Sequence, residues 1–206
     1  MKKPAINYFF MLLAIGSIGF LSGCNNEDET PAPAQAEFNA DLSNTGVILS
    51  SQYASAGEGS FYASQTKTVG TSSSSEAENV DVTYADIATS GTASDEPMFV
   101  SPDYRSSVNQ EGTNGPVTDL NDAGTTYFKA TSLDLSDASA AEVAAEIDSI
   151  GTEKSIEITG VDTNYLFSNS QTNSQGIIKV TELIQVETST EGEFTSSIKF
   201  DIKVLK

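Results

Sequence analysis

The stretch Ile198-Lys199-Phe200-Asp201-Ile202-Lys203-Val204 alternates apolar and polar side chains without a break. This two-residue period is that of a β-strand with one face buried and one face in water. Gly176–Thr188, shortly before it, is rich in Ile, Leu and Val, and Glu191-Gly192 between the two segments has the composition of a turn. We therefore predict an antiparallel hairpin in which Gly176–Thr188 pairs with Phe194–Leu205.

Short apolar segments earlier in the chain predict further strands. Each is only a few residues long and lies near stretches rich in Gly, Pro, Ser or Asn. The segments are Val47-Ile48-Leu49, Phe61-Tyr62, Val80–Tyr84, Pro97–Val100, Ser155–Thr159 and Asn164–Phe167. In contrast, Val108–Thr125 contains several Gly and Asn residues and a Pro, which predicts a long irregular connection.

One helix is predicted by a capping motif that an apolar face follows. In Ser139-Ala140-Ala141-Glu142, the Ser hydroxyl and the Glu carboxylate can accept the first backbone N–H groups of a helix. Val143, Ile147 and Ile150 follow at helical spacing, and Gly151 has the position of a C-terminal glycine. Strands and helices do not alternate, so we predict a mainly β to α+β domain. It would contain antiparallel sheets or a sandwich, with one short amphipathic helix at about residues 139–150.

The first 23 residues have the pattern of a secretory signal. Lys2 and Lys3 precede an apolar segment that ends in Leu21-Ser22-Gly23-Cys24. This ending resembles the lipobox of bacterial lipoproteins, whose residues before the Cys form the signal-peptidase motif. The resemblance implies that residues 1–23 are removed and that Cys24 carries lipid, which would anchor the protein to a membrane. The alternative is an uncleaved membrane helix.

Residues 24–37 have the composition of a tether. Asn25-Asn26-Glu27-Asp28-Glu29 resembles the acidic sequence that directs Bacteroidota lipoproteins to the outer face of the outer membrane. An acidic run is also typical of a simple solvated segment. Two Pro residues in Thr30–Gln35 favour an extended spacer. We predict that a single β-rich domain follows, over residues 38–206.

The composition excludes several kinds of chemistry. The chain has 10 Lys and Arg against 29 Asp and Glu, a net charge of −19. Without Lys2 and Lys3 the balance becomes 8 against 29, and the charge becomes −21. Nucleic acids and anionic membrane surfaces are therefore disfavoured as partners, because proteins bind both through Lys and Arg. With no His and a single Cys, the chain cannot form a His-dependent catalytic triad, a His/Cys metal site or an internal disulfide.

Five segments behind the lipobox carry a resemblance to a known family. They are Phe61-Tyr62, Val80-Asp81-Val82-Thr83-Tyr84, Val100-Ser101-Pro102, Thr126-Tyr127-Phe128-Lys129 and Gly176-Ile177-Ile178-Lys179-Val180. In this order they resemble uncharacterised surface lipoproteins of the Bacteroidota. The resemblance covers most of the chain after Cys24. It implies an outer-membrane location, a domain that faces the cell exterior and a β-rich fold, and it implies no catalytic residue.

Four Tyr residues are candidates for ligand contacts, because aromatic rings stack on sugars and anchor protein interfaces. They are Tyr62, Tyr84, Tyr104 and Tyr127. The alternative is that the hydrophobic core needs most of these rings.

Side-chain oxygens offer a candidate calcium site, the one cofactor that the sequence suggests. Asp119, Asn121 and Asp122 lie close together, but Ala130 stands where an EF-hand loop would carry its final Glu. Asp134 and Asp137 form a second acidic pair, at a position that favours helix capping over metal binding.

The enzyme hypothesis that best fits a chain without His is a glycan hydrolase that uses two carboxylates. Such an enzyme needs one acid with a raised pKa. Asp103 has an aromatic neighbour, yet Arg105 close by in the sequence would lower its pKa. We therefore predict no enzymatic activity.

Three hypotheses for the function remain. We favour a lipid-anchored, non-catalytic binding or structural module at the outer membrane surface, with a glycan or a surface protein as partner. The alternatives are a carboxylate-dependent glycan hydrolase and a calcium-stabilised adhesion or spacer module. Lys179, Lys199 and Lys203 could form a strip for an anionic partner, but we predict that they protect an exposed strand edge from pairing with other chains.

Overall fold

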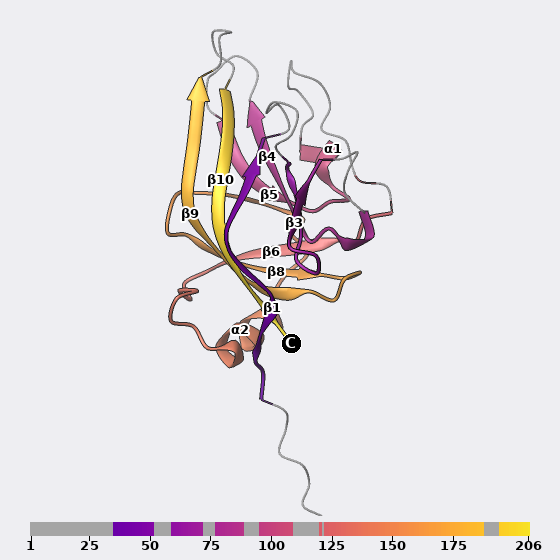
Figure 1. Cartoon of the computed structure of the whole chain (residues 1–206), viewed down its shortest axis with the longest axis vertical. Coiled ribbons are helices and arrows are strands. Elements are labelled where there is room, and N and C mark those ends of the chain that lie inside the picture. The colour runs from indigo at the N-terminus through magenta and orange to yellow at the C-terminus, as the bar shows by residue number, and fades with distance from the viewer. Residues whose placement is uncertain are drawn as a thin grey trace, which may run out of the picture. The chain divides into compact units, whose positions relative to one another are not determined.

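Two β-sheets packed face to face make up the described part of the chain (Figure 1). The computed structural model describes residues 35–51, 59–71, 77–88, 95–108, 120, 122–187 and 194–206. The strands are β1 (Phe38–Ser50), β2 (Phe61–Ala63), β3 (Thr68–Gly70), β4 (Val82–Ala88), β5 (Asp95–Val100), β6 (Thr126–Thr131), β7 (Ser155–Glu157), β8 (Asn164–Asn169), β9 (Gln175–Glu187) and β10 (Phe194–Leu205).

The strands form two antiparallel five-stranded sheets. Sheet A has the order β1-β10-β9-β8-β6, and sheet B has the order β3-β2-β4-β5-β7. A 3₁₀ turn, η1 (Ala77–Asn79), and two helices, α1 (Arg105–Val108) and α2 (Ala140–Ile147), complete the described elements. The predicted mainly β to α+β fold is therefore confirmed, in its sandwich form. Most of the predicted connection Val108–Thr125 lies outside the described residues.

The predicted hairpin is confirmed and forms the centre of sheet A. β9 pairs with β10 from Phe194 opposite Glu187 to Val204 opposite Gly176. Gly176 is required at this register, because a Cβ there would lie 2.0 Å from the carbonyl oxygen of Lys203. The apolar members of the alternating stretch are buried between the sheets: Ile198, Phe200, Ile202 and Val204. The predicted turn Glu191-Gly192 lies outside the described residues.

Aromatic rings join the two sheets. Phe200 in sheet A makes edge contacts with Tyr62 and Phe99 in sheet B, at ring-centroid distances of 5.9 and 5.7 Å. Phe99 also contacts Phe128 at 6.1 Å and Tyr165 at 5.5 Å, both in sheet A. Burial of each such ring contributes about 1.5–3 kcal/mol to the free energy of folding, so this cluster supplies a large part of the stabilisation from the core.

Helix α2 begins as the capping motif predicts. Ser139 is the N-cap, and its side chain and that of Glu142 form the capping box. The apolar face of α2 packs on the outer face of sheet A, where Val143 and Ile147 join a cluster with Leu166 and Ile177. The predicted end was too late, because the helix stops at Ile147 and Gly151 does not adopt the left-handed conformation of a C-terminal glycine. No helix within the described ranges has the length and apolar character that crossing a membrane requires.

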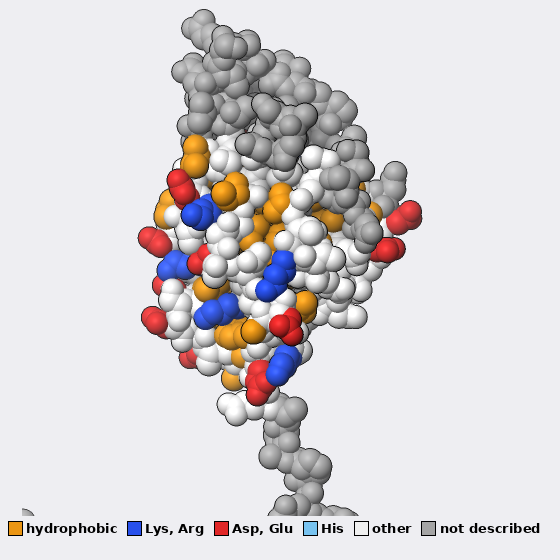
Figure 2. Space-filling model, viewed as in Figure 1, with side chains coloured by type: hydrophobic (Ala, Val, Ile, Leu, Met, Phe, Trp, Pro, Cys, Tyr) orange, Lys and Arg blue, Asp and Glu red, His pale blue; other side chains and the backbone are white. Residues whose placement is uncertain are grey.

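The predicted edge role of the three lysines is wrong. Lys179 lies on β9 and Lys199 and Lys203 lie on β10, and both strands have a neighbour on each side. Lys203 instead donates to the carbonyl oxygen of Leu135 at 2.6 Å. Figure 2 shows Lys and Arg side chains lying among Asp and Glu side chains rather than forming one continuous basic patch.

The true edge of sheet A at this side is β1, and its pairing with β10 is irregular. The register shifts between Asn39 and Asn44 and again between Asn44 and Val47. Gly46 has a φ of +65°, which favours glycine, and its N–H donates to the Asp201 carboxylate at 2.7 Å. Such bulges twist an edge strand and interrupt its outward row of backbone groups.

A buried carboxylate links turns of the two sheets. Asp81 has no exposed surface, and one of its oxygens accepts the backbone N–H of Ser64 at 2.7 Å and the Ser64 hydroxyl at 2.6 Å. Its other oxygen accepts the hydroxyl of Thr172, in the turn between β8 and β9. These three donors satisfy a charge that would otherwise be costly to bury.

We expect Asp81→Ala to lower the free energy of unfolding by about 3 kcal/mol, because the substitution leaves buried donors without their acceptor. Chemical denaturation measures the change. Asp41→Ala removes the same charge from an exposed position and should alter stability by less than about 0.5 kcal/mol. Equal effects of the two substitutions would contradict the structural role given to Asp81.

Candidate functional site

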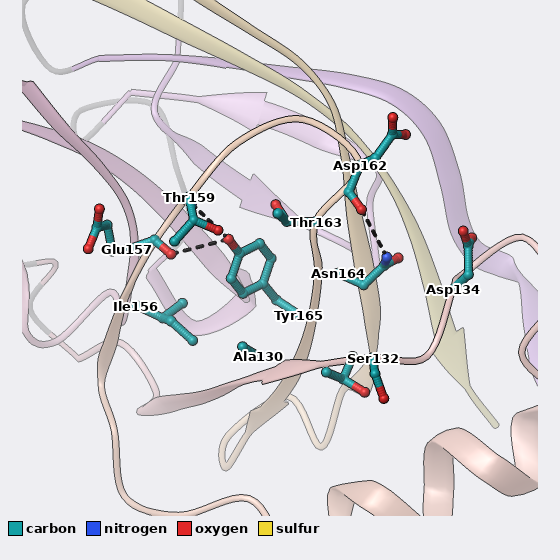
Figure 3. Close-up of a pocket in the computed structure, with 11 residues that line it drawn as sticks. Ala130, Ser132, Asp134, Ile156, Glu157, Thr159, Asp162, Thr163, Asn164 and Tyr165 are labelled. Atoms are coloured by element: carbon teal, nitrogen blue, oxygen red, sulfur yellow. Dashed lines mark hydrogen bonds between the residues drawn. The ribbon is translucent and has the colours of Figure 1, made fainter.

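A groove with a volume of about 620 Å³ lies where the ends of β6, β7 and β8 meet. Figure 3 shows the ring of Tyr165 in its middle, with Glu157 to one side and Asp162, Asn164 and Asp134 to the other. The lining residues come from three strands and the turns beside them: Ala130, Thr131, Ser132, Asp134, Ile156, Glu157, Thr159, Asp162, Thr163, Asn164 and Tyr165. The groove thus combines an apolar middle with hydroxyl, amide and carboxylate groups.

The groove exists because two edge strands from different sheets meet and then diverge. β6 is an edge of sheet A and β7 is an edge of sheet B. The backbone N–H of Phe128 donates to the carbonyl of Glu153 at 2.9 Å, which joins the sheets just before β7. Farther along, Ala130 and Ile156 line the opening between the two strands.

The hydroxyl of Tyr165 closes the edge of β7 at the bottom of the groove. It donates to the carbonyl oxygen of Glu157 at 3.2 Å and accepts the backbone N–H of Thr159 at 3.1 Å. These are backbone groups that another strand would otherwise pair with. Because the Tyr165 hydroxyl occupies these backbone groups, a peptide strand cannot pair with them, and a ligand of the groove meets side chains at this point.

The turn before β8 holds one carboxylate on the groove rim. Asp162 has a φ of +62°, which is uncommon for a residue with a side chain. The conformation is fixed on both sides, because the Asp162 N–H donates to the Val180 carbonyl at 2.9 Å and Asn164 donates to the Asp162 carbonyl at 3.3 Å. The Asp162 side chain is 80% exposed and can meet a ligand.

Lys179 brings two of the rim carboxylates together. Its ammonium group lies 3.1 Å from both carboxylate oxygens of Asp134 and 3.7 Å from a carboxylate oxygen of Asp162. The backbone N–H of Ser136 and the Lys179 ammonium lower the pKa of Asp134, while the hydrogen bond to Asp134 raises the pKa of Lys179. Asp134 is thus ionised at neutral pH, which suits a hydrogen-bond acceptor and not a general acid.

The four Tyr candidates do not line this groove. Tyr62 and Tyr84 have no exposed surface, so these two cannot stack on a ligand and the prediction for them is wrong. Burial raises the pKa of Tyr62, and Tyr84 shares a 2.5 Å hydrogen bond with Ser196 inside the core. Tyr104 and Tyr127 are half-buried.

The candidate calcium residues are not assembled into a site in the described part of the chain. Asp119 and Asn121 lie outside the described residues, and Asp122 is exposed with a φ of +64°. Among the residues that the structure describes, no group of three His, Cys, Asp or Glu side chains is placed to hold a metal ion. Asp134 accepts the N–H of Ser136 with its side chain and the N–H of Asp137 with its backbone carbonyl, so it stabilises the turn before α2.

Asp103 is paired with a different cation from the one expected. Lys154 lies 2.7 Å from its carboxylate, whereas the buried Arg105 donates to the Tyr84 carbonyl and packs over the ring of Phe61 at 4.4 Å. Partial burial alone would raise the pKa of Asp103, but hydrogen bonds from Lys154, Ser101 and Thr125 lower it. The predicted direction of the pKa is confirmed, and its physical cause is corrected.

Sequence reasoning missed the groove itself. The sequence signal for it is the turn Gly160-Val161-Asp162-Thr163, which separates the predicted strands Ser155–Thr159 and Asn164–Phe167. The comparisons with known proteins add no further site residue, because no protein-family model, curated protein or solved structure matches the chain.

The Asp103–Lys154 pair predicts a small acid-dependent contribution to stability. A carboxyl with a lowered pKa in the folded state stabilises the fold above its ordinary pKa of 3.8. That contribution disappears as the pH falls through the lower, folded value. Asp103→Asn should therefore destabilise the protein at pH 7 by less than about 1 kcal/mol, because the pair is partly exposed to solvent.

The difference between Asp103→Asn and the unsubstituted protein should shrink as the pH is lowered below 3.8, as denaturant titrations at several pH values would show. Glu153→Gln, at an exposed position, is the control with the same loss of charge. A difference that grows on acidification would refute the assignment.

Proposed function

We propose that this chain is a lipid-anchored, non-catalytic binding protein of the outer membrane surface, and that the groove between β6, β7 and β8 binds a glycan. The single observation that carries the proposal for the groove is its lining. Carboxylate, amide and hydroxyl groups surround an apolar middle formed by Ala130 and Ile156, with the buried Tyr165 at its floor. Sugars have the matching chemistry, with hydroxyl groups at their rims and C–H surfaces on their faces.

The charge of the groove supports a ligand without negative charge. Three carboxylates line it, from Asp134, Glu157 and Asp162, and no Lys or Arg is among its lining residues. Ionised carboxylates accept hydroxyl donors strongly. The same charges oppose phosphate groups, which agrees with the exclusion of nucleic acids that the composition predicts.

A binding role is favoured over hydrolysis. A carboxylate-dependent hydrolase needs one acid held protonated near neutral pH. In this groove the pKa of Asp134 is lowered, and its partner is a lysine that stabilises the ionised form. The placement at the outer membrane rests on the lipobox around Cys24 and on the acidic residues Glu27-Asp28-Glu29.

Asp162→Asn and Glu157→Gln should each weaken glycan binding about tenfold or more, because each removes a charged acceptor. We would screen the purified protein in detergent micelles against neutral oligosaccharides of glucose, galactose, mannose and xylose, and then use calorimetry. Glu153→Gln, an exposed acid outside the groove, should bind as the unsubstituted protein does. The proposal fails if no glycan binds, or if the groove variants bind as tightly as the control.

Cys24→Ala should release the protein from membranes, because the variant has no sulfur to carry lipid. Membrane sedimentation and immunoblotting measure the release. Protease added to intact cells should digest the unsubstituted protein without permeabilisation if the domain faces outward. A Cys24→Ala protein that still sediments with membranes would show that an uncleaved helix anchors it. If the unsubstituted protein on intact cells resists the protease until the outer membrane is permeabilised, the domain lies in the periplasm.

A further inference from the structure

We propose that Lys179 is a positioning residue that holds Asp134 and Asp162 as one acceptor unit for two neighbouring hydroxyl groups of a neutral sugar. The inference rests on the proposed glycan function of the groove and names the class of glycan. The three residues come from separate elements: Lys179 from β9, Asp162 from the turn before β8, and Asp134 from the turn before α2. The unit exists only in the folded chain.

The position of Lys179 is fixed by the sheet. Its backbone lies opposite Asn164 in the β8–β9 ladder, at the point where the Asp162 turn enters β8. The Lys179 side chain is only 15% exposed, whereas the carboxylates it contacts are 47% exposed for Asp134 and 80% exposed for Asp162. The ammonium group is thus largely buried, whereas the two carboxylates are exposed to solvent. A ligand would therefore contact the carboxylates before it contacts Lys179.

The two carboxylates keep unused hydrogen-bonding capacity on the rim of the groove. An ionised carboxylate has about four lone-pair positions. Asp134 uses some of these for the N–H of Ser136 at 2.8 Å and for Lys179 at 3.1 Å. The contact between Asp162 and Lys179, at 3.7 Å, is an ion pair beyond hydrogen-bonding distance. Two adjacent hydroxyl groups can therefore donate to two different acids without displacing a protein hydrogen bond.

The same arrangement selects against anionic ligands. An anionic sugar, such as a uronate, would bring its carboxylate near those of Asp134, Glu157 and Asp162, which line the groove. Lys179 neutralises only part of this charge, so the rim stays negative. A neutral diol meets no such repulsion, so the geometry favours neutral sugars over anionic ones.

Calorimetry on the full protein in micelles tests the inference, with the neutral oligosaccharide that binds best as the probe. Lys179→Met should weaken binding about tenfold or more, because the two acids then repel each other and lose their common partner. Lys179→Arg should restore most of the affinity. Lys199→Met makes the same substitution on the neighbouring strand, outside the groove, and should leave binding unchanged.

Two further readouts separate positioning from mere structural support. In Lys179→Met, the pKa of Asp134 measured by NMR should rise toward its ordinary value, while the melting temperature stays close to that of Lys199→Met. If Lys179→Met does not fold, the NMR measurement is made on Lys179→Gln, where the same rise is required. Uronate-containing oligosaccharides of matched length should bind about tenfold more weakly than neutral ones at low salt, with the difference shrinking as salt is added.

The outcomes distinguish this inference from the proposed function. Neutral oligosaccharides that bind equally to the unsubstituted protein and to Lys179→Met would overturn the role of Lys179 and leave the glycan function standing. Tighter binding of uronates would overturn the charge selection. If the unsubstituted protein binds no oligosaccharide, both the proposed function and this inference are wrong.

Discussion

The packing of Phe99 against three rings of the opposite sheet is the contact on which the rest of the described structure depends. Phe99 lies on β5, and its neighbours Phe128, Tyr165 and Phe200 lie on β6, β8 and β10. Since interiors are close-packed, rings of this size fix how far apart the sheets lie and how they are aligned. The same contact places Tyr165 so that its hydroxyl reaches the edge of β7. The floor of the groove is therefore a consequence of core packing.

Features that depend on a few neighbouring residues could be predicted from the sequence. The alternation in Ile198–Val204 gave the hairpin, and the capping box Ser139–Glu142 gave the start of α2. The order of strands in a sheet is set by contacts distant in sequence, and local patterns do not encode it. For this reason the edge role predicted for the lysines of β9 and β10 is wrong, and the structure places both strands inside sheet A.

The groove could not be predicted for the same physical reason. Asp134 and Lys179 are 45 residues apart, and the pairing of β8 with both β6 and β9 brings them together. Nor does sequence show which tyrosine faces the core, because a shift of one residue in register moves a side chain to the other face of its sheet. All three of Tyr62, Tyr84 and Tyr165 belong to the core, and only Tyr165, which was not among the predicted site residues, also takes part in the groove.

The interrupted edges of the sandwich have a consequence for crowding. β1 carries two register shifts, and the Tyr165 hydroxyl occupies backbone groups of β7. Chains anchored in one membrane, as proposed for this protein, share an orientation and collide side by side far more often than chains in dilute solution. An unbroken edge would turn such collisions into lateral fibres. Irregular edges would instead keep such chains as separate molecules even when they are crowded on one membrane.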